Sequence, residues 1–109
     1  MPATVVSITS GTWTAPTTGD LPAAAGTPTN CGAVTSGSTI YIRSTQAFKF
    51  GFYASSGAAV TAFASTTHGR LDAGVWPIPT IGQTSTNSLF VERASGAADT
   101  NGLSYWSEG

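Results

Sequence analysis

The chain has 109 residues, which is the size of a single domain. Gly, Ala, Ser and Thr make up 60 of these residues, and four basic and five acidic residues give a formal net charge of -1. Because so few cations cannot neutralise many phosphates, we expect neither nucleic acid nor an anionic membrane as a partner. No apolar run approaches the roughly 18 residues that a membrane span needs. Met1 to Thr4 have neither the cationic nor the apolar region of a secretory signal, so none is expected.

The composition is nevertheless that of a folded protein. Hydrophobic residues make up 40% of the chain and aromatic residues 10%, whereas disordered chains combine high charge with few aromatics. Because most side chains are small, we expect a thin core that gains from further burial in an oligomer.

The first third of the chain is predicted to contain two strands separated by a long loop. β-Branched residues from Thr4 to Ser10 suit a pleated surface better than a helix. From Thr17 to Asn30, two prolines and two glycines occur, and such residues break ladders and helices. We therefore expect a loop-rich N-terminal arm around residues 14–30, followed by a short strand from Cys31 to Val34.

The clearest strand signal lies in the middle of the chain. From Thr39 to Arg43, two isoleucines alternate with Tyr41 and Arg43, which point the other way, and three phenylalanines alternate from Phe48 to Tyr53. The four residues from Ser44 to Ala47 fit a hairpin connection between these strands. We expect this hairpin to form the core of a sheet and to bury one face, made of Ile40, Ile42, Phe48, Phe50 and Phe52.

Turn signals divide the remaining chain into short segments. From Ala58 to Ala64 a strand is favoured over a short helix, and Val75 to Pro79 must be extended because proline disfavours helix in the preceding residue. Ser88 to Arg93 alternates as a strand. Asn101-Gly102 is a hairpin-turn signal, after which Leu103 to Ser107 is predicted as the last strand.

These elements predict an all-β fold. About seven or eight short strands between turns are typical of an antiparallel β-sandwich or a jelly-roll-like barrel. The length predicts a single β domain over residues 1–109. No long segment has the 3.6-residue period of a helix, which disfavours an α or α/β fold.

Residues with catalytic or metal-binding chemistry are few and scattered. His68 is the only histidine and is interpreted as a solvated loop residue, and the single cysteine, Cys31, as a small buried hydrophobe. A zinc or calcium site needs several ligands at suitable spacing, which Asp20, Asp72 and Asp99 do not supply. We therefore expect no catalytic residue, no metal and no cofactor, and no enzymatic activity.

The tryptophans leave three interpretations open. Trp13, Trp76 and Trp106 all lie beside turn residues. They are suited to closing the ends of a thin core, to anchoring a protein interface, or to lining a sugar-binding face. As candidate interface anchors we select Trp13, Trp76, Tyr105 and Trp106.

The last third of the chain resembles small virion structural proteins of bacteriophages. The resemblance rests on the strand-like run from Leu89 to Gly96 and on the final segment from Gly102 to Gly109, which reads GLSYWSEG. Polar-flanked strands from Ser38 to Ala54 and the run from Ala73 to Pro77 follow the same pattern. The similarity covers about the last 70 residues and does not include the N-terminal arm.

The resemblance implies a capsid decoration, or cement, protein. Such a protein would be made in the host cytoplasm and would reside on the capsid surface of the virion. Its partner would be the major capsid protein or another virion protein, and it would be a homo-oligomer, a trimer by analogy with other head-cement proteins. Two alternatives remain: a receptor- or carbohydrate-binding module of a phage tail fibre or spike, and, with less support, a small hydrolase.

Overall fold

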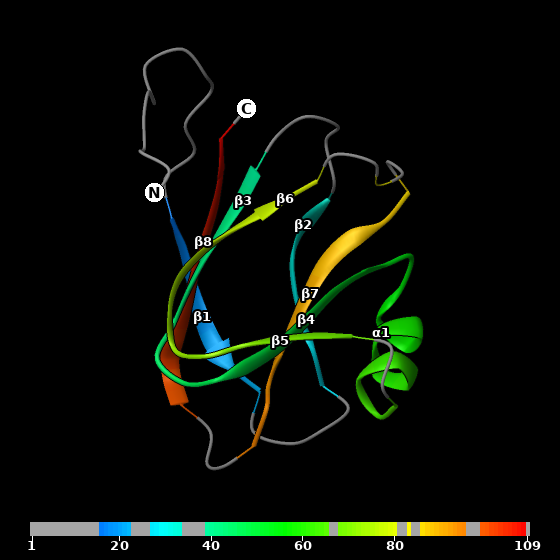
Figure 1. Cartoon of the computed structure of the whole chain (residues 1–109), viewed down its shortest axis with the longest axis horizontal. Helices are drawn as coiled ribbons and strands as arrows, with labels where there is room; N and C mark the ends of the chain where they lie inside the picture. The colour runs from blue at the N-terminus through cyan, green and yellow to red at the C-terminus, as the bar shows by residue number, and fades with distance from the viewer. Residues whose placement is uncertain are drawn as a thin grey trace.

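A computed structural model of the chain describes residues 16–22, 27–33, 39–65, 68–80, 83, 86–95 and 99–108. The strand predicted from Thr4 to Ser10 lies outside the described residues. The described chain forms two four-stranded antiparallel sheets and one short helix (Figure 1). The predicted all-β, sandwich-like fold is therefore confirmed.

Each sheet is assembled from strands that are distant in the sequence. In sheet A the order is β1 (Thr17–Leu21), β8 (Asp99–Glu108), β3 (Thr39–Ser44) and β6 (Gly74–Pro79). In sheet B it is β2 (Thr29–Ala33), β7 (Ser88–Arg93), β4 (Phe48–Tyr53) and β5 (Gly69–Leu71). The helix α1 (Ser56–Phe63) lies beside sheet B, on the side away from sheet A (Figure 1).

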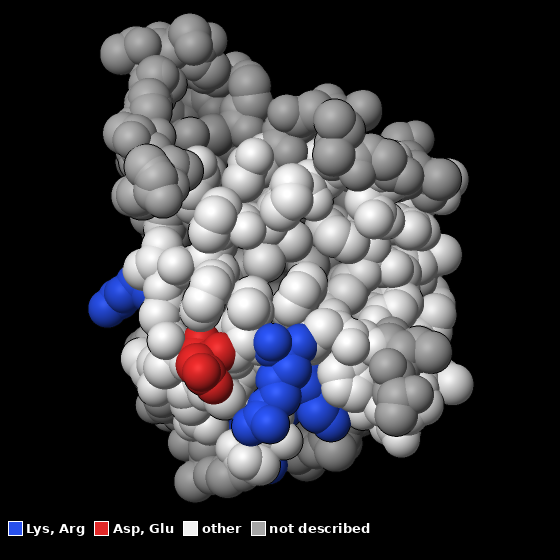
Figure 2. Space-filling view, viewed as in Figure 1, with Lys and Arg blue, Asp and Glu red and all other residues white. Residues whose placement is uncertain are grey.

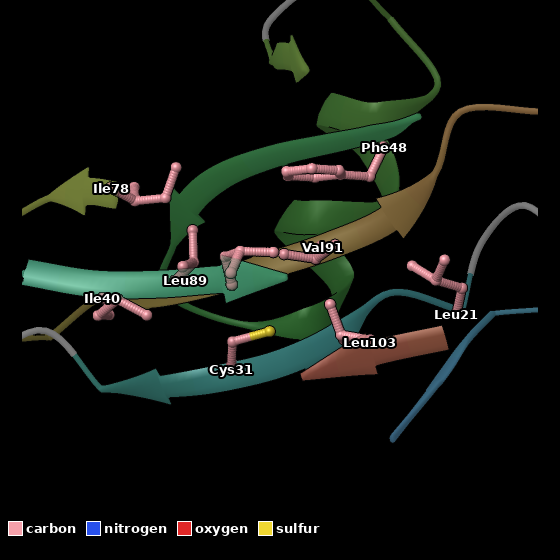
Figure 3. Close-up of a cluster of buried hydrophobic side chains, with 9 residues drawn as sticks. Leu21, Cys31, Ile40, Phe48, Ile78, Leu89, Val91 and Leu103 are labelled. Atoms are coloured by element: carbon pink, nitrogen blue, oxygen red, sulfur yellow. The ribbon is translucent and has the colours of Figure 1, made fainter. Parts of the chain in front are cut away.

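The main core fills the space between the two sheets (Figure 3). Alternate residues of β3 are buried there, as the period of a half-buried strand requires. Five half-buried side chains, among them Phe50, Phe52, Trp76 and Tyr105, pack against it. The buried members are Leu21, Cys31, Ile40, Ile42, Phe48, Ile78, Leu89, Val91 and Leu103.

The predicted hairpin of the middle strands is wrong, although its buried face is largely right. β3 pairs with β6 and β8, whereas β4 pairs with β5 and β7, so the chain crosses from one sheet to the other. The crossing is fixed locally by the Ser44 hydroxyl, which donates to the Gln46 carbonyl at 2.6 Å, and by the Thr45 N–H, which donates to the Gly102 carbonyl at 3.0 Å. A short connection can join two strands of one hairpin or carry the chain from one sheet to the other. In both cases the alternation directs Ile40, Ile42 and Phe48 into the same core.

The strand predicted from Ala58 to Ala64 is also wrong, because this segment belongs to α1. The Ser55 hydroxyl accepts a bond from the Ala58 N–H at 3.2 Å, which is an N-cap. The helix then buries Ala59, Ala62 and Phe63. A cap and alanine-rich packing together outweigh the strand preference of the intervening β-branched residues.

The N-terminal arm predicted around residues 14–30 contains two strand segments, so the loop prediction is wrong there. β1 covers Thr17–Leu21 and pairs with β8, and β2 begins at Thr29. The prolines lie between the strands, where their missing N–H removes no ladder bond. The Pro22 carbonyl accepts a bond from Arg93 Nε at 2.6 Å, which fixes the end of β1.

Asn101-Gly102 is a bulge inside β8, and the predicted hairpin turn is wrong. Asn101 has a φ of 55°, in the left-handed region that asparagine tolerates better than most residues. The register between β1 and β8 shifts between Gly19 and Leu21, opposite this point. The Asn101 N–H donates to Asp20 Oδ1 at 2.7 Å, so the bulge is held from the neighbouring strand.

Candidate interaction face

The helix α1 covers the outer face of sheet B over β4 and β7. Phe90 of β7 and the half-buried Tyr53 of β4 form a second core with Ala59 and Phe63 of α1. The Tyr53 and Phe63 rings meet edge to face, with centroids 5.6 Å apart. Lys49 Nζ donates to the Phe63 carbonyl at 3.0 Å, which stabilises the C-terminal end of the helix. The part of this face over β4 and β7 is therefore occupied by α1.

The outer face of sheet A carries an aromatic row that crosses three strands. In β3, Ile40 and Ile42 are buried while Tyr41 between them is half-buried and points outward. The register places Tyr41 opposite Pro77 of β6 on one side and Trp106 of β8 on the other. Directly opposed residues of an antiparallel pair share a face, so Pro77, Tyr41 and Trp106 form the aromatic row.

A second row runs parallel to it, one step along the strands. Val75, Arg43, Ser104 and Thr18 are opposed in turn across β6, β3, β8 and β1. We call these four residues the mixed row, and the two rows together define the outer face of sheet A. Val75 is 56% exposed and is the large hydrophobic side chain most exposed among the described residues.

Tyr41 and Trp106 stack on one another. Their ring centroids are 5.4 Å apart and the ring planes differ by 8°. Such a pair stabilises the sheet by about 0.5–1.5 kcal/mol beyond the burial of its area. The stacked, half-buried rings form an uncharged aromatic surface on the outer face of sheet A.

The structure separates the four predicted interface anchors. Trp106 lies on the outer face of sheet A, whereas Tyr105, its neighbour, packs against the core between the sheets. Trp76 also packs against that core, and its Nε1–H donates to the Asp72 carbonyl at 2.8 Å. Trp13 lies outside the described residues.

Of the residues on this face, only Trp106 is selected from the sequence as a site residue, and Tyr41 is the aromatic residue that is missed. Its outward direction could be read from the alternation with Ile40 and Ile42. Its position beside Trp106 could not, because Tyr41 and Trp106 are brought together only by the register of β3 with β8.

His68 is not the solvated loop residue that the sequence analysis predicted. It is half-buried beside the end of α1, where its Nδ1 lies 3.1 Å from the Ala62 carbonyl oxygen. Its ring also meets Phe63 edge to face, with centroids 5.8 Å apart. These contacts give His68 a structural role at the helix end.

Cys31 is a small buried hydrophobe, as predicted. It is 4% exposed and lies in the core between the sheets, near Leu103 (Figure 3). Burial raises the pKa of its thiol far above the ordinary value of 9.0. The thiolate is the reactive form, so this residue is a poor nucleophile near neutral pH. Burial and the nearby Cys31 also raise the pKa of Tyr105.

A pocket of about 200 Å³ lies between β2 of sheet B and the strands of sheet A, and the described residues that line it include no Asp, Glu, Lys, Arg or His. Its titratable groups among these residues are Cys31 and Tyr105, whose pKa values are raised by burial. Among the described residues, no three His, Cys, Asp or Glu side chains gather closely enough to hold a metal ion. The pocket is lined by Thr17, Cys31, Gly32, Ala33, Ile40, Tyr105, Trp106 and Ser107.

Charged side chains are sparse on the surface. On the face shown in Figure 2, those of the described residues gather in the lower half, and the described surface above them is uncharged. The described part of the chain contains no helix that is long and apolar enough to cross a membrane.

No protein-family model, no curated protein and no solved structure matches this chain.

Proposed function

We propose that the chain is a structural protein of the bacteriophage particle, a capsid decoration or cement protein that binds through the outer face of sheet A. The resemblance of the last third of the sequence supports the phage assignment. The observation that supports this mode of binding is the aromatic row of Pro77, Tyr41 and Trp106 on the outer face of sheet A. The helix α1 packs on the other side of the sandwich, against sheet B.

The residue types of this face suit contact with another protein. Trp, Tyr and Arg are enriched in interfaces and carry much of the binding energy, while Lys and Glu are depleted there. The rings of Tyr41 and Trp106 already contact one another in the unbound chain. Binding therefore loses little side-chain entropy at these two residues.

A cement function needs no catalytic group, and it tolerates weak individual contacts. Many copies on one particle act together, so modest binding at each site adds up across the capsid surface. The partner under this proposal is the major capsid protein or another virion protein, and the chain acts as a homo-oligomer, with a trimer suggested by analogy alone.

The proposal is tested by adding the purified chain to phage particles that lack it and measuring cosedimentation. Wild-type chain should bind to saturation at a fixed number of copies per particle. Trp106→Ala should weaken binding by about tenfold or more, because it removes the larger ring of the stacked pair. Arg70→Ala, an exposed substitution on sheet B, serves as the control. A folded wild-type chain that does not bind particles contradicts the proposal.

The Tyr41–Trp106 pair also supports the second candidate, a receptor- or carbohydrate-binding module of a tail fibre or spike. The apolar face of a sugar ring can rest on an aromatic face, and Thr18 of the mixed row adds an exposed hydroxyl. A glycan array distinguishes the two functions. Saturable glycan binding that Trp106→Ala abolishes, without binding to particles, favours this second candidate.

A further inference from the structure

Arg43 is the only basic residue that the described structure places on the outer face of sheet A. It lies in the mixed row on β3, which is flanked on both sides by other strands. Of the remaining basic residues, Lys49 and Arg70 oppose one another on sheet B, and Arg93 Nε donates to the Pro22 carbonyl. The cation on this face is therefore isolated from the others.

The Arg43 guanidinium is exposed and has no hydrogen-bond or ion-pair partner among the described residues. Its opposed neighbours in the mixed row are Val75 and Ser104, which carry no charge. Asp20 of β1 is the acidic side chain described on the same sheet, and its carboxylate accepts the Asn101 N–H at 2.7 Å. Among the described residues, no acidic side chain pairs with Arg43.

A partner that covers the aromatic row must also cover Arg43, which is two residues from Tyr41 on the same strand. A charge that is removed from water without a partner is strongly destabilising. A guanidinium is more weakly hydrated than an ammonium group and pairs with a carboxylate through two parallel hydrogen bonds. The chemistry that satisfies Arg43 in such an interface is therefore a carboxylate.

We propose that Arg43 determines the specificity of docking by pairing with an acidic side chain of the partner protein, next to apolar groups that cover the aromatic row. This inference rests on the proposed function and adds the chemistry of the partner surface. Basic or uncharged surfaces of similar shape are rejected, because they leave Arg43 buried without a counter-charge.

The test measures binding of Arg43 variants to phage particles that lack the chain, over a series of salt concentrations. Arg43→Gln should weaken binding by at least about 30-fold and reduce its salt dependence. Arg43→Lys should bind between the two, and Arg43→Glu should not bind measurably. Arg70→Gln is the matched control, because it removes the same charge from an exposed position on sheet B and should change binding less than about twofold.

A second measurement examines the partner surface directly. Converting the exposed carboxylates of the particles to amides should reduce wild-type binding to the level of Arg43→Gln and leave that variant unaffected. Thermal unfolding of each variant establishes that it is folded. Because the Arg43 side chain is exposed, its substitution should not disturb the fold.

The outcomes separate this inference from the proposed function. If Trp106→Ala loses binding while Arg43→Gln binds like the wild type, the outer face of sheet A is the interface and the proposed role of Arg43 is wrong. If Arg43→Gln and Arg70→Gln weaken binding equally, a general charge effect replaces the specific pair. If the folded wild-type chain does not bind particles, both the proposed function and this inference are wrong.

Discussion

The three phenylalanines of β4 differ in burial although their spacing is regular. Phe48 is completely buried, whereas Phe50 and Phe52 are half-buried and pack at the margin of the core. Phe48 lies opposite Leu71 of β5, Phe50 lies opposite Gly69, which has no side chain, and Phe52 lies beyond the end of β5. The residue opposite each phenylalanine therefore contributes to how much of its ring is covered.

Phe48→Ala should lower the free energy of unfolding by about 3–5 kcal/mol, because it opens a cavity in the core between the sheets. Phe50→Ala should cost less, since part of that ring is already in contact with water. Urea unfolding followed by circular dichroism measures both changes. Equal losses for the two variants would contradict the difference in burial.

Cys31 links the stability of the fold to alkaline pH. The unfolded chain releases the thiol proton near the ordinary pKa of 9.0, whereas burial raises the pKa in the folded chain. Above about pH 9 the unfolded state therefore binds fewer protons than the folded state, and the free energy of unfolding falls by about 1.4 kcal/mol per pH unit. Below that pH the contribution of Cys31 is fully present.

Urea unfolding of wild-type chain and Cys31→Ala between about pH 8 and pH 10 measures this dependence. The alanine variant should lack the decrease that begins near pH 9. Tyr53 and Tyr105, whose pKa values are also raised by burial, ordinarily ionise at 10.0 and contribute mainly above this range. Parallel curves for the two chains would show that the thiol does not remain protonated in the folded state.

At the scale of the element, β6 is an edge strand that contains two prolines. Pro77 and Pro79 are two residues apart, so the backbone nitrogens of both are on the same side of the strand. Proline is tolerated in an edge strand where that side faces solvent. The outer edge of sheet A at β6 therefore has few donors to pair with a strand from another molecule.

Replacing both prolines by threonine restores two N–H donors at this edge and favours strand geometry. The double variant should self-associate more than the parent chain as concentration rises, which light scattering detects. Val75→Thr in the same strand is the control, because it adds no backbone donor. An unchanged molar mass in the double variant would show that the prolines do not protect this edge.

Alternation along a strand could be read from the sequence, but pairing between strands could not. The inward and outward sides of β3 and the extended conformation of β6 follow from residue types that are adjacent in the chain. The crossing of β3 to β4 and the pairing of Tyr41 with Trp106 depend on residues up to 65 positions apart. The candidate face therefore became visible only when the register of sheet A was known.

Local signals failed where two of them competed. Ser55 caps α1, yet the following residues also fit a short strand, and packing against Phe90 decides for the helix. Asn101-Gly102 correctly signals a residue with positive φ. The same backbone geometry serves a bulge as well as a turn, and the neighbouring Asp20 determines which one forms.

At the scale of the whole molecule, the described chain has three layers: sheet A, sheet B and α1. The sheets enclose one core, and sheet B and α1 enclose the other. β1 closes the sandwich because it pairs with β8 over most of its length, from Thr17 opposite Tyr105 to Leu21 opposite Asp99. The segment from Thr17 to Leu21 is thus integral to sheet A.

Deleting residues 17–22 should therefore abolish the cooperative fold. The deletion exposes one edge of β8, which is central in sheet A, and removes Leu21, a completely buried member of the core. Leu21→Ala alone should lower the free energy of unfolding by about 2–5 kcal/mol. Thr18→Ala is the control, since this exposed side chain lies outside the core. Calorimetry should show no unfolding transition for the deletion variant, whereas a transition like that of the parent would mean that β1 is a detachable arm.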